Sequence, residues 1–535
     1  MKDARKGARS GTGNRASTAG TGRRGAWILA ATILGSSMAY IDGTVVNVAL
    51  PVLQKDFGAR IDQVQWVVEA YTLLLASLVL VGGTLGDRYG RRRIYALGIA
   101  VYSVASLWCG LAPDIGQLIA ARALQGIGGA LLVPGSLAII TASFPESERG
   151  SAIGTWSGLS AVSTAIGPLL GGWLVDNISW RGVFFINIPI AAVILLILFR
   201  HVPESSDDEA PRQLDWTGAA LVATGLGALV FGLIEANRLG FSHPLIPGAI
   251  AAGALLLAAF IMVERRISAP MLPLHLFASR TFTGANLLTL LLYAALNGMF
   301  FFLGFNMIQV QGYSATATGA ALLPFIVLIS TLSRWSGKLA AVLGARPLLA
   351  AGPAVCAGGY VLFLLSGAGH GDGASYWTEF FPAITVVGLG MAITVAPLTY
   401  TVMSSVSERH AGTASGINNS VSWLSGLLSI AVLGLVAVSS FSAGLERSLP
   451  AAGLPPAASR SILEQRSKLA AVELPPGLPE AQQAAAGQAI ESSFVESFHV
   501  MMLICAGLAL GSGIAGFLMI EGGTGRKKGS AAGAG

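Results

Sequence analysis

Cysteine, histidine and charged residues are scarce in this sequence. Its 535 residues include three cysteines and six histidines, and 11% are Asp, Glu, Lys or Arg, whereas a typical soluble domain has about 25% charged residues. The cysteines all lie inside apolar runs, where they provide neither a disulfide framework nor metal-ligand spacing. No metal site is therefore predicted, and the 53% hydrophobic content indicates a polytopic membrane protein.

The same scarcity disfavours classes of protein that need clustered reactive side chains. No Walker-type phosphate loop is present, and Gly126, Gly128 and Gly129 follow no predicted strand. The net charge of +6 does not indicate a nucleic-acid partner, because the basic residues cluster beside apolar runs instead of forming one patch. A membrane enzyme and a non-transporting receptor are the alternatives from other classes.

Fourteen apolar runs are each long enough to cross a membrane as a helix. A hydrocarbon core about 30 Å thick needs roughly 20 helical residues for one crossing. The tenth run is the weakest. The runs lie at 27–50, 64–83, 94–112, 117–142, 151–175, 182–200, 215–235, 244–264, 281–308, 316–333, 346–367, 379–403, 412–440 and 497–520.

The distribution of Lys and Arg predicts the orientation in the membrane. With the N-terminus inside, the cytoplasmic segments hold 24 Lys/Arg and the outer segments hold eight. This bias follows the positive-inside rule. We therefore expect a disordered basic cytoplasmic tail at 1–25, a cytoplasmic tail at 521–535, and a multi-pass protein of the plasma (inner) membrane with both termini in the cytoplasm.

An internal repeat predicts two related halves. The pattern of Gly83, Leu85, Gly90 and Arg92 returns at an offset of 254 residues as Gly337, Leu339, Gly344 and Arg346. Related halves are a common architecture of membrane transporters. The fold class predicted is therefore all-α, with fourteen helices arranged 6+2+6. Its parts are a six-helix bundle at 26–200, a linker and two inserted helices at 201–264, and a six-helix bundle at 265–520 that includes a long outer loop at 441–496.

Three charged residues fall inside the predicted spans away from the first and last residues of each run. Placing such a charge at a helix centre costs about 2.5–3.5 kcal/mol on insertion scales, so it normally faces a cavity or a partner. Asp42 is interpreted as a proton or cation site, or alternatively as a packed acid. Glu69 is interpreted as a second proton site, as an anion that attracts a cationic substrate, or as an interfacial acid. Arg122 must find a carboxylate or carbonyl partner, and we predict that it pairs with Asp42 or Glu69.

Two further patterns predict moving parts. The segment Gly83-Thr84-Leu85-Gly86-Asp87-Arg88-Tyr89-Gly90-Arg91-Arg92-Arg93 stands between the second and third runs, and we expect its charges to make and lose contacts during gating. Gly167, Pro168, Gly171 and Gly172 predict a kinked, closely packed fifth helix. The second half lacks this kink, so the symmetry of the repeat does not require it.

The substrate path is predicted more loosely, from polar and aromatic side chains within the spans. Each of these side chains could equally be ordinary packing. The candidates are Tyr40, Trp66, Phe305, Asn306, Asn418 and Asn419.

Several segments resemble one transporter family. The segment 83–93 resembles the loop between spans 2 and 3 of major facilitator superfamily transporters. The fourteen-span drug:proton antiporters of the EmrB/QacA type share further patterns, namely Asn47-Val48-Ala49-Leu50-Pro51, Trp66-Val67-Val68-x-x-Tyr71, Gln311-Gly312-Tyr313-Ser314 with Pro324, and Ala411-Gly412-x-Ala414-x-Gly416. The resemblance implies the major facilitator fold, and it implies that the Gly-Pro kink marks an antiporter. It also implies that the span-1 acid and the span-4 arginine take part in proton coupling.

The sequence departs from some relatives in two ways. Ser163 stands where the span-5 pattern often has glycine, and spans 10 and 13 hold no acid of the kind found in exporters of divalent cations. We therefore expect proton-coupled efflux of monocationic or neutral lipophilic drugs, or of one antibiotic. The proton gradient supplies the energy without a cofactor, and a monomer is expected with the drug, protons and the lipid bilayer as partners. The alternative is a proton-coupled exporter or importer of a small metabolite.

Overall fold

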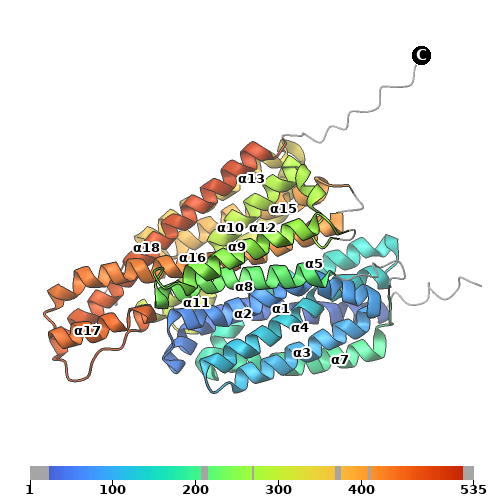
Figure 1. Ribbon diagram of the computed structural model, residues 1–535. Coiled ribbons are helices and arrows are strands. Elements are labelled where there is room, and N and C mark those ends of the chain that lie inside the picture. The colour runs from blue at the N-terminus through green and yellow to red at the C-terminus, as the bar shows by residue number, and fades with distance from the viewer. Residues whose placement is uncertain (1–22, 207–214, 268–269, 368–374, 408–410, 522–535) are drawn as a thin grey trace, which may run out of the picture.

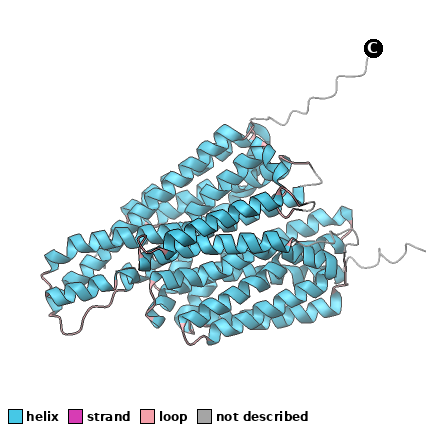
Figure 2. Ribbon diagram, in the orientation of Figure 1, coloured by secondary structure: helices cyan, strands magenta, loops and turns pink. Residues whose placement is uncertain are grey.

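The computed structural model describes residues 23–206, 215–267, 270–367, 375–407 and 411–521. These residues form helices joined by short turns, and no strand occurs among them (Figure 2). Fourteen helical segments within this part of the chain are long and apolar enough to cross a membrane, which confirms the predicted count. Nearly all of the two predicted tails falls outside the described residues.

The first six crossings pack against one another. Helix α4 contacts both α2 and α3, and α1 lies against α5. The sixth crossing is broken at Ile186 into a short α6 and a longer α7. The helices are α1 (Arg23–Phe57), α2 (Ile61–Tyr89), α3 (Arg91–Leu111), α4 (Ile115–Ser143), α5 (Glu146–Asn177), α6 (Gly182–Phe185) and α7 (Asn187–His201).

The two inserted crossings pack mainly on each other. They are α8 (Trp216–Leu239) and α9 (Leu245–Glu264). Helix α8 also contacts α2 and α16, which belong to different bundles, so the inserted pair lies beside the junction between the bundles. The order of helices along the chain is therefore the predicted 6+2+6.

The last six crossings form the second bundle. Helix α15 contacts α12 and α13, while α18 contacts α10, α13 and α16. The elements are η1 (Leu274–Ala278), α10 (Arg280–Phe305), η2 (Asn306–Val310), α11 (Ala315–Ala321), α12 (Leu323–Leu343), α13 (Ala345–Leu362), η3 (Phe363–Leu365), α14 (Tyr376–Glu379), α15 (Phe381–Ser404), α16 (Ala411–Ser448) and α18 (Glu480–Met519).

The long loop predicted at 441–496 is largely helical. Helices α16 and α18 have 38 and 40 residues, which at 1.5 Å per residue gives about 57–60 Å, roughly twice the thickness of a bilayer core. Their ends project together from one end of the molecule (Figure 1). The turn between them contains η5 (Leu449–Ala452), α17 (Pro456–Glu464) and η6 (Arg466–Ala471).

The two bundles meet at one end and diverge at the other (Figure 1). The start of α1 and the end of α18 lie at the diverging end, which we call the termini face, and the opposite end is the closed face. At the closed face, Gln309 donates hydrogen bonds to the side chain of Gln54, at 2.9 Å, and to the carbonyl of Pro51. Near the termini face, a Cβ placed on Gly154 or Gly158 of α5 would meet no other atom within 4 Å. The molecule is therefore open toward the termini face.

Two predicted helix ends are corrected. Helix α2 runs to Tyr89 and α3 starts at Arg91, so nearly all of the predicted arginine-rich loop is helical. Gly90, at φ +107°, makes the turn by itself. Helix α12 continues to Leu343, ten residues past the predicted end of the tenth span, and its last turns carry an arginine and a lysine. Charge marks the edge of the membrane, whereas a helix ends where its backbone turns.

Candidate functional site

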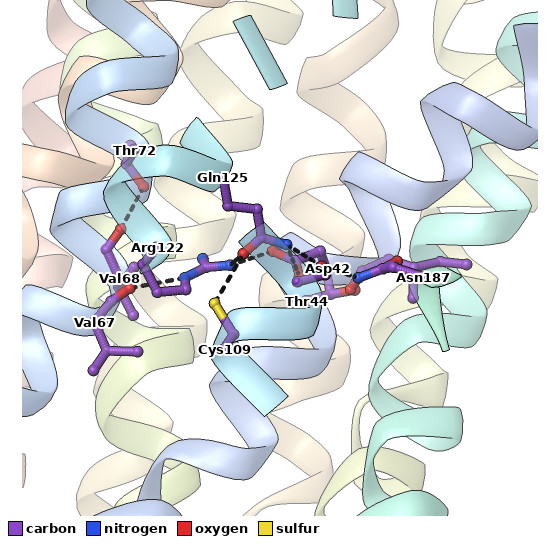
Figure 3. Close-up of polar contacts among 12 residues, drawn as sticks. Asp42, Thr44, Val67, Val68, Thr72, Cys109, Arg122, Gln125 and Asn187 are labelled. Atoms are coloured by element: carbon purple, nitrogen blue, oxygen red, sulfur yellow. Dashed lines mark hydrogen bonds and ion pairs between the residues drawn. The ribbon is translucent and has the colours of Figure 1, made fainter. Parts of the chain in front are cut away.

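Asp42 and Arg122 form a buried ion pair between α1 and α4. The guanidinium Nη1 of Arg122 donates to Oδ2 of Asp42 at 2.6 Å, and both side chains are at most 1% exposed (Figure 3). The predicted pairing of Arg122 with an intramembrane acid is thus present, and the acid is Asp42. The Arg122 Nε also donates to the carbonyl of Val67 at 3.0 Å, which ties α4 to α2.

Gln125, one turn after Arg122, completes this pair. Its amide nitrogen donates to Oδ1 of Asp42 at 3.0 Å, and its amide oxygen accepts from Arg122 at 2.7 Å. The same nitrogen donates to Ser106 of α3 at 2.8 Å, and Ser106 also accepts from Asn187 of α7 at 3.0 Å. Each oxygen of Asp42 therefore has its own donor.

Sequence reasoning assigned no role to the supporting residues Gln125, Ser106 and Asn187. All three are at most 1% exposed. Placing a single amide or hydroxyl group in an apolar run costs too little free energy to identify the residue from the sequence, because neighbouring helices usually form hydrogen bonds with it. The spacing of Gln125, three residues after the buried arginine and so on the same face of α4, is the signal that could have identified it.

Aromatic rings enclose the arginine. The guanidinium carbon of Arg122 lies 4.3 Å from the ring centre of Tyr71 and 5.9 Å from that of Phe184. These contacts add attraction to the cation while keeping water from it. Removing one partner of such a pair typically costs 3–5 kcal/mol, since the other charge stays buried alone.

Glu69 lies apart from this network. It is fully buried, and neither carboxylate oxygen has a hydrogen-bond partner among the described residues. Glu69 therefore has no contact with water of the kind that an acid at the membrane surface would have. On the same face of α2, Gln65 donates to the carbonyl of Ile430 in α16, and Leu73 approaches Gly227 of α8. Glu69 thus stands on the face of α2 turned toward α8 and the second bundle.

A cavity of about 310 Å³, which we call the central cavity, lies between the two bundles. It is lined by Tyr40 and Asn47 of α1, Tyr293 of α10 and Trp423 of α16, and it reaches Arg122. The cavity therefore touches the buried ion pair through its arginine. Of the six predicted path residues, Tyr40 lines it.

A second cavity of about 110 Å³ adjoins the first and is almost entirely apolar. Thr44, Asn47 and Thr164 line both, so the two are neighbours. The second cavity extends to Pro168 within α5 and to Phe325 of α12.

The other five predicted path residues do not line either cavity. Trp66 packs against Phe231 of the inserted helix α8, with ring centres 6.5 Å apart. Phe305 and Asn306 are fully buried at the end of α10, where Asn306 accepts from Gln311. Asn418 donates to Asn286 and to Thr289 within the second bundle, and Asn419 is exposed. Residue type alone does not distinguish a cavity wall from helix packing, and these five residues lie outside the two cavities.

The predicted gating segment makes contacts that hold the first bundle together. Asp87 accepts from Arg91 at 2.8 Å, while Arg92 and Arg93 lie 3.7 and 3.6 Å from Glu204, which follows α7. The backbone N–H of Arg92 also donates to Glu204 at 3.0 Å. Glu204 was not identified from the sequence.

The remaining positions of the gating segment make different contacts. Arg88 lies over the ring of Tyr89, with 5.0 Å from its guanidinium carbon to the ring centre. Gly83 packs close to Pro134 of α4, where a Cβ would be 3.5 Å from the proline Cβ.

The glycines of α5 allow three helices to approach closely. A Cβ on Gly167 would lie 2.0 Å from Thr44 of α1, and one on Gly171 would lie 3.0 Å from Val45. A Cβ on Gly172 would lie 2.3 Å from the backbone oxygen of Ala315, so this glycine faces α11 of the other bundle. The predicted close packing around Pro168 is confirmed, and it includes the contact that closes the two bundles together.

Asp176, one turn beyond Gly172, caps α11 from the opposite bundle. Its carboxylate accepts from the backbone N–H groups of Ala315 at 3.1 Å and Thr316 at 2.7 Å, and from the Thr316 hydroxyl. Negative charge at a helix N-terminus is stabilising. This acid was not identified from the sequence, because its partner lies 139 residues away.

We expect Asp176→Asn to weaken closure at this face. Replacing the charge-assisted bonds by neutral ones should shift the open-to-closed ratio by about two- to fivefold, from the roughly 0.3–1 kcal/mol that an exposed charge contributes at a helix N-terminus. Distances between spin labels on the closed-face ends of α5 and α12 would report the shift.

The matched control is Asp114→Asn. Asp114 caps its own helix α4 by accepting from Gln117 at 2.9 Å and makes no described contact with the other bundle. An unchanged distance distribution in Asp176→Asn would contradict the prediction.

Comparison with known proteins agrees with this arrangement. A sequence model described as Major Facilitator Superfamily matches residues 32–430. The chain belongs to the major facilitator superfamily. This superfamily member is 35% identical over 443 residues to the Multidrug resistance protein Stp of Mycobacterium tuberculosis, covering 82% of this chain and 80% of Stp.

Two relatives from Streptomyces extend the comparison. The Puromycin resistance protein pur8 of Streptomyces alboniger is 36% identical, and the match covers 78% of this chain and 83% of pur8. The Tetracenomycin C resistance and export protein of Streptomyces glaucescens is 31% identical over 92% of both chains. Relatives of this superfamily member thus carry names of drug and antibiotic resistance.

Solved structures share the major facilitator fold at low sequence identity. A bacterial homologue of the human lysosomal transporter Spinster, in an inward-facing and occupied conformation, has a TM-score of 0.64 at 19% identity. The match covers 94% of this chain and 97% of that one. The inward-open xylose transporter XylE of Escherichia coli has a TM-score of 0.53 at 14% identity, with 94% and 97% covered.

Proposed function

We propose that this chain exports lipophilic drugs or antibiotics across the plasma membrane in exchange for protons, by alternating access. The observation that carries the proposal is that Arg122 belongs to two structures at once: it lines the central cavity and it pairs with Asp42. A proton on Asp42 competes with Arg122 for the carboxylate and frees the guanidinium to turn toward the cavity, where its charge disfavours a lipophilic or cationic substrate. Proton binding and substrate binding therefore oppose each other through this one arginine. Such competition is a direct way to couple the two binding events.

The proton step follows from the contacts of Asp42. A proton on its carboxyl group removes the charge that holds Arg122, and the arginine can then turn toward the cavity. Loss of the proton restores the pair. Glu69 is proposed as the second proton site, because a dry carboxyl group without partners is stable only in its neutral form. No cofactor beyond the proton gradient enters this cycle.

The cavities support a lipophilic substrate. The central cavity offers Tyr40, Asn47 and Trp423 as polar or aromatic contacts, while the adjoining cavity is almost entirely apolar. A substrate with one polar and one apolar part suits this pair of spaces. The drug and antibiotic resistance names of the relatives favour the same class.

The orientation is proposed from charge. Cytoplasmic termini satisfy the positive-inside rule, and the termini face toward which the molecule is open then faces the cytoplasm. The gating segment is proposed to loosen its contacts with Glu204 as the first bundle moves. A monomer is proposed, since one chain encloses both cavities.

The proposal is tested in inside-out vesicles that contain the full chain. A pH gradient, acid inside, is followed with a quenched dye while compounds are added, including puromycin, tetracenomycin C and lipophilic monocations. Antiport predicts that a transported compound discharges the gradient in vesicles with the protein and not in vesicles without it. Discharge by sugars or amino acids alone would favour the alternative, a proton-coupled transporter of a small metabolite.

A further inference from the structure

Two basic side chains stand inside the last turns of a membrane-spanning helix. Arg334 and Lys338 lie one turn apart on α12, within a 29-residue span from Ala315 to Leu343. Both are exposed, and in the described part of the chain neither forms an ion pair. The proposed transport cycle uses neither residue. A cation at the edge of a membrane normally extends its side chain toward the headgroups.

Lys338 also lines a groove on the outside of the second bundle. The groove has a volume of about 540 Å³ and lies between α12, α13 and α15. Its walls are mostly aliphatic and include Leu339 and Val342 of α12, Leu348 of α13 and Leu389 of α15. None of the residues lining it lines the central or the adjoining cavity. The groove is therefore separate from the substrate space.

The depth of the groove is indicated by Trp335. This side chain lines the groove and is 71% exposed. Tryptophan is enriched at the boundary between hydrocarbon and headgroups. Lys338 follows it by one turn toward the termini face, which places the ammonium group at headgroup level. Leu332 of α12 precedes Trp335 by one turn, and Leu389 of α15 lies deeper still, because the neighbouring Gly388 packs against Phe325, so this part of the groove lies in the hydrocarbon.

We propose that this groove binds an anionic phospholipid of the leaflet at the termini face. One acyl chain lies along the aliphatic walls, and the phosphate group contacts Lys338 and Arg334. The complementarity is twofold, since apolar walls suit the chain and two unpaired cations suit the negative headgroup. A neutral lipid would fill the same walls but would leave both cations without a counter-charge. This inference does not depend on which substrate is exported.

The full-length protein in mixed-lipid nanodiscs provides the test. A photoreactive phosphatidylglycerol with the reactive group on its acyl chain is expected to label the peptide that contains residues 332–342. Photoreactive phosphatidylcholine is expected to label it far less. The double variant Arg334→Gln/Lys338→Gln should weaken phosphatidylglycerol labelling by about thirtyfold, at roughly fivefold for each basic residue.

Two further variants make the outcome decisive. Lys55→Gln/Arg460→Gln removes the same charge from exposed residues of the opposite face and should leave labelling unchanged. Leu389→Trp keeps both cations but fills the groove, and it should abolish labelling of this peptide. Equal labelling by phosphatidylcholine would overturn the proposal. Phosphatidylglycerol labelling that survives Leu389→Trp would also overturn it, because the cations would then attract headgroups without a docked chain.

Discussion

We expect Asp42→Asn to abolish proton-driven efflux, with a loss of transport of at least about a hundredfold. The substitution removes the carboxyl group that exchanges the proton and leaves the charge of Arg122 buried without its partner. Breaking such a pair costs about 3–5 kcal/mol, which corresponds to a factor of a few hundred or more. Discharge of a pH gradient by substrate in inside-out vesicles measures the loss.

Two controls separate lost coupling from lost folding. Asp56→Asn removes an acid from the same helix, but this side chain is half exposed and its contact with Arg181 is 3.4 Å long, so transport should continue. Asp42→Asn/Arg122→Met replaces the pair by groups without charge, which should restore stability but not coupling. Full proton-driven efflux by Asp42→Asn would contradict the proposed mechanism.

The second large effect is expected for Gly172→Ala. One added methyl group would lie 2.3 Å from the backbone oxygen of Ala315 and 2.6 Å from Thr316 Cα. Backbone atoms cannot move aside as a flexible side chain can, so α5 and α11 must separate. We expect the closed face to stay open and turnover to fall by at least about tenfold, since overpacking of this kind typically costs 1–3 kcal/mol.

Gly154→Ala is the matched control on the same helix. It adds the same methyl group and the same gain in helix propensity, but a Cβ at Gly154 meets no other atom within 4 Å. Spin-label distances across the closed face should widen in Gly172→Ala and stay unchanged in Gly154→Ala. Identical behaviour of the two variants would show that α5 and α11 need not touch during transport.

Features were predictable from the sequence where the free-energy cost of placing polar or charged groups in lipid falls on a single segment. Fourteen apolar runs predicted fourteen crossings, because the cost of burying polar backbone and charge in lipid acts on each segment separately. Arg122 was predicted to pair with Asp42 or Glu69 for the same reason, since a charge does not stay alone in the membrane. The glycines around Pro168 likewise indicated close packing before any neighbour was known.

Features that depend on distant partners were not predictable. Gln125 and Asp176 are ordinary polar residues until helices far away in the sequence bring them donors or acceptors. Phe305 and Asn306 have the composition of a substrate path but face the packed interior of the second bundle. The contribution of such residues is set by the packing of helices, on which a single sequence carries little information.

The paired ends of α16 and α18 have a practical consequence. A membrane protein of 54.9 kDa with few soluble parts gives images that are difficult to align in single-particle microscopy. Here α16 and α18 extend beyond the bilayer side by side, and an ion pair between Arg447 and Glu496, at 2.7 Å, connects them. The side-chain amide of Gln54 in α1 also donates a hydrogen bond of 3.1 Å to the carbonyl of Lys468, which lies in the turn between these two helices. Because the projection is anchored in both bundles, an antibody fragment raised against it would report the orientation of the whole particle without blocking either cavity.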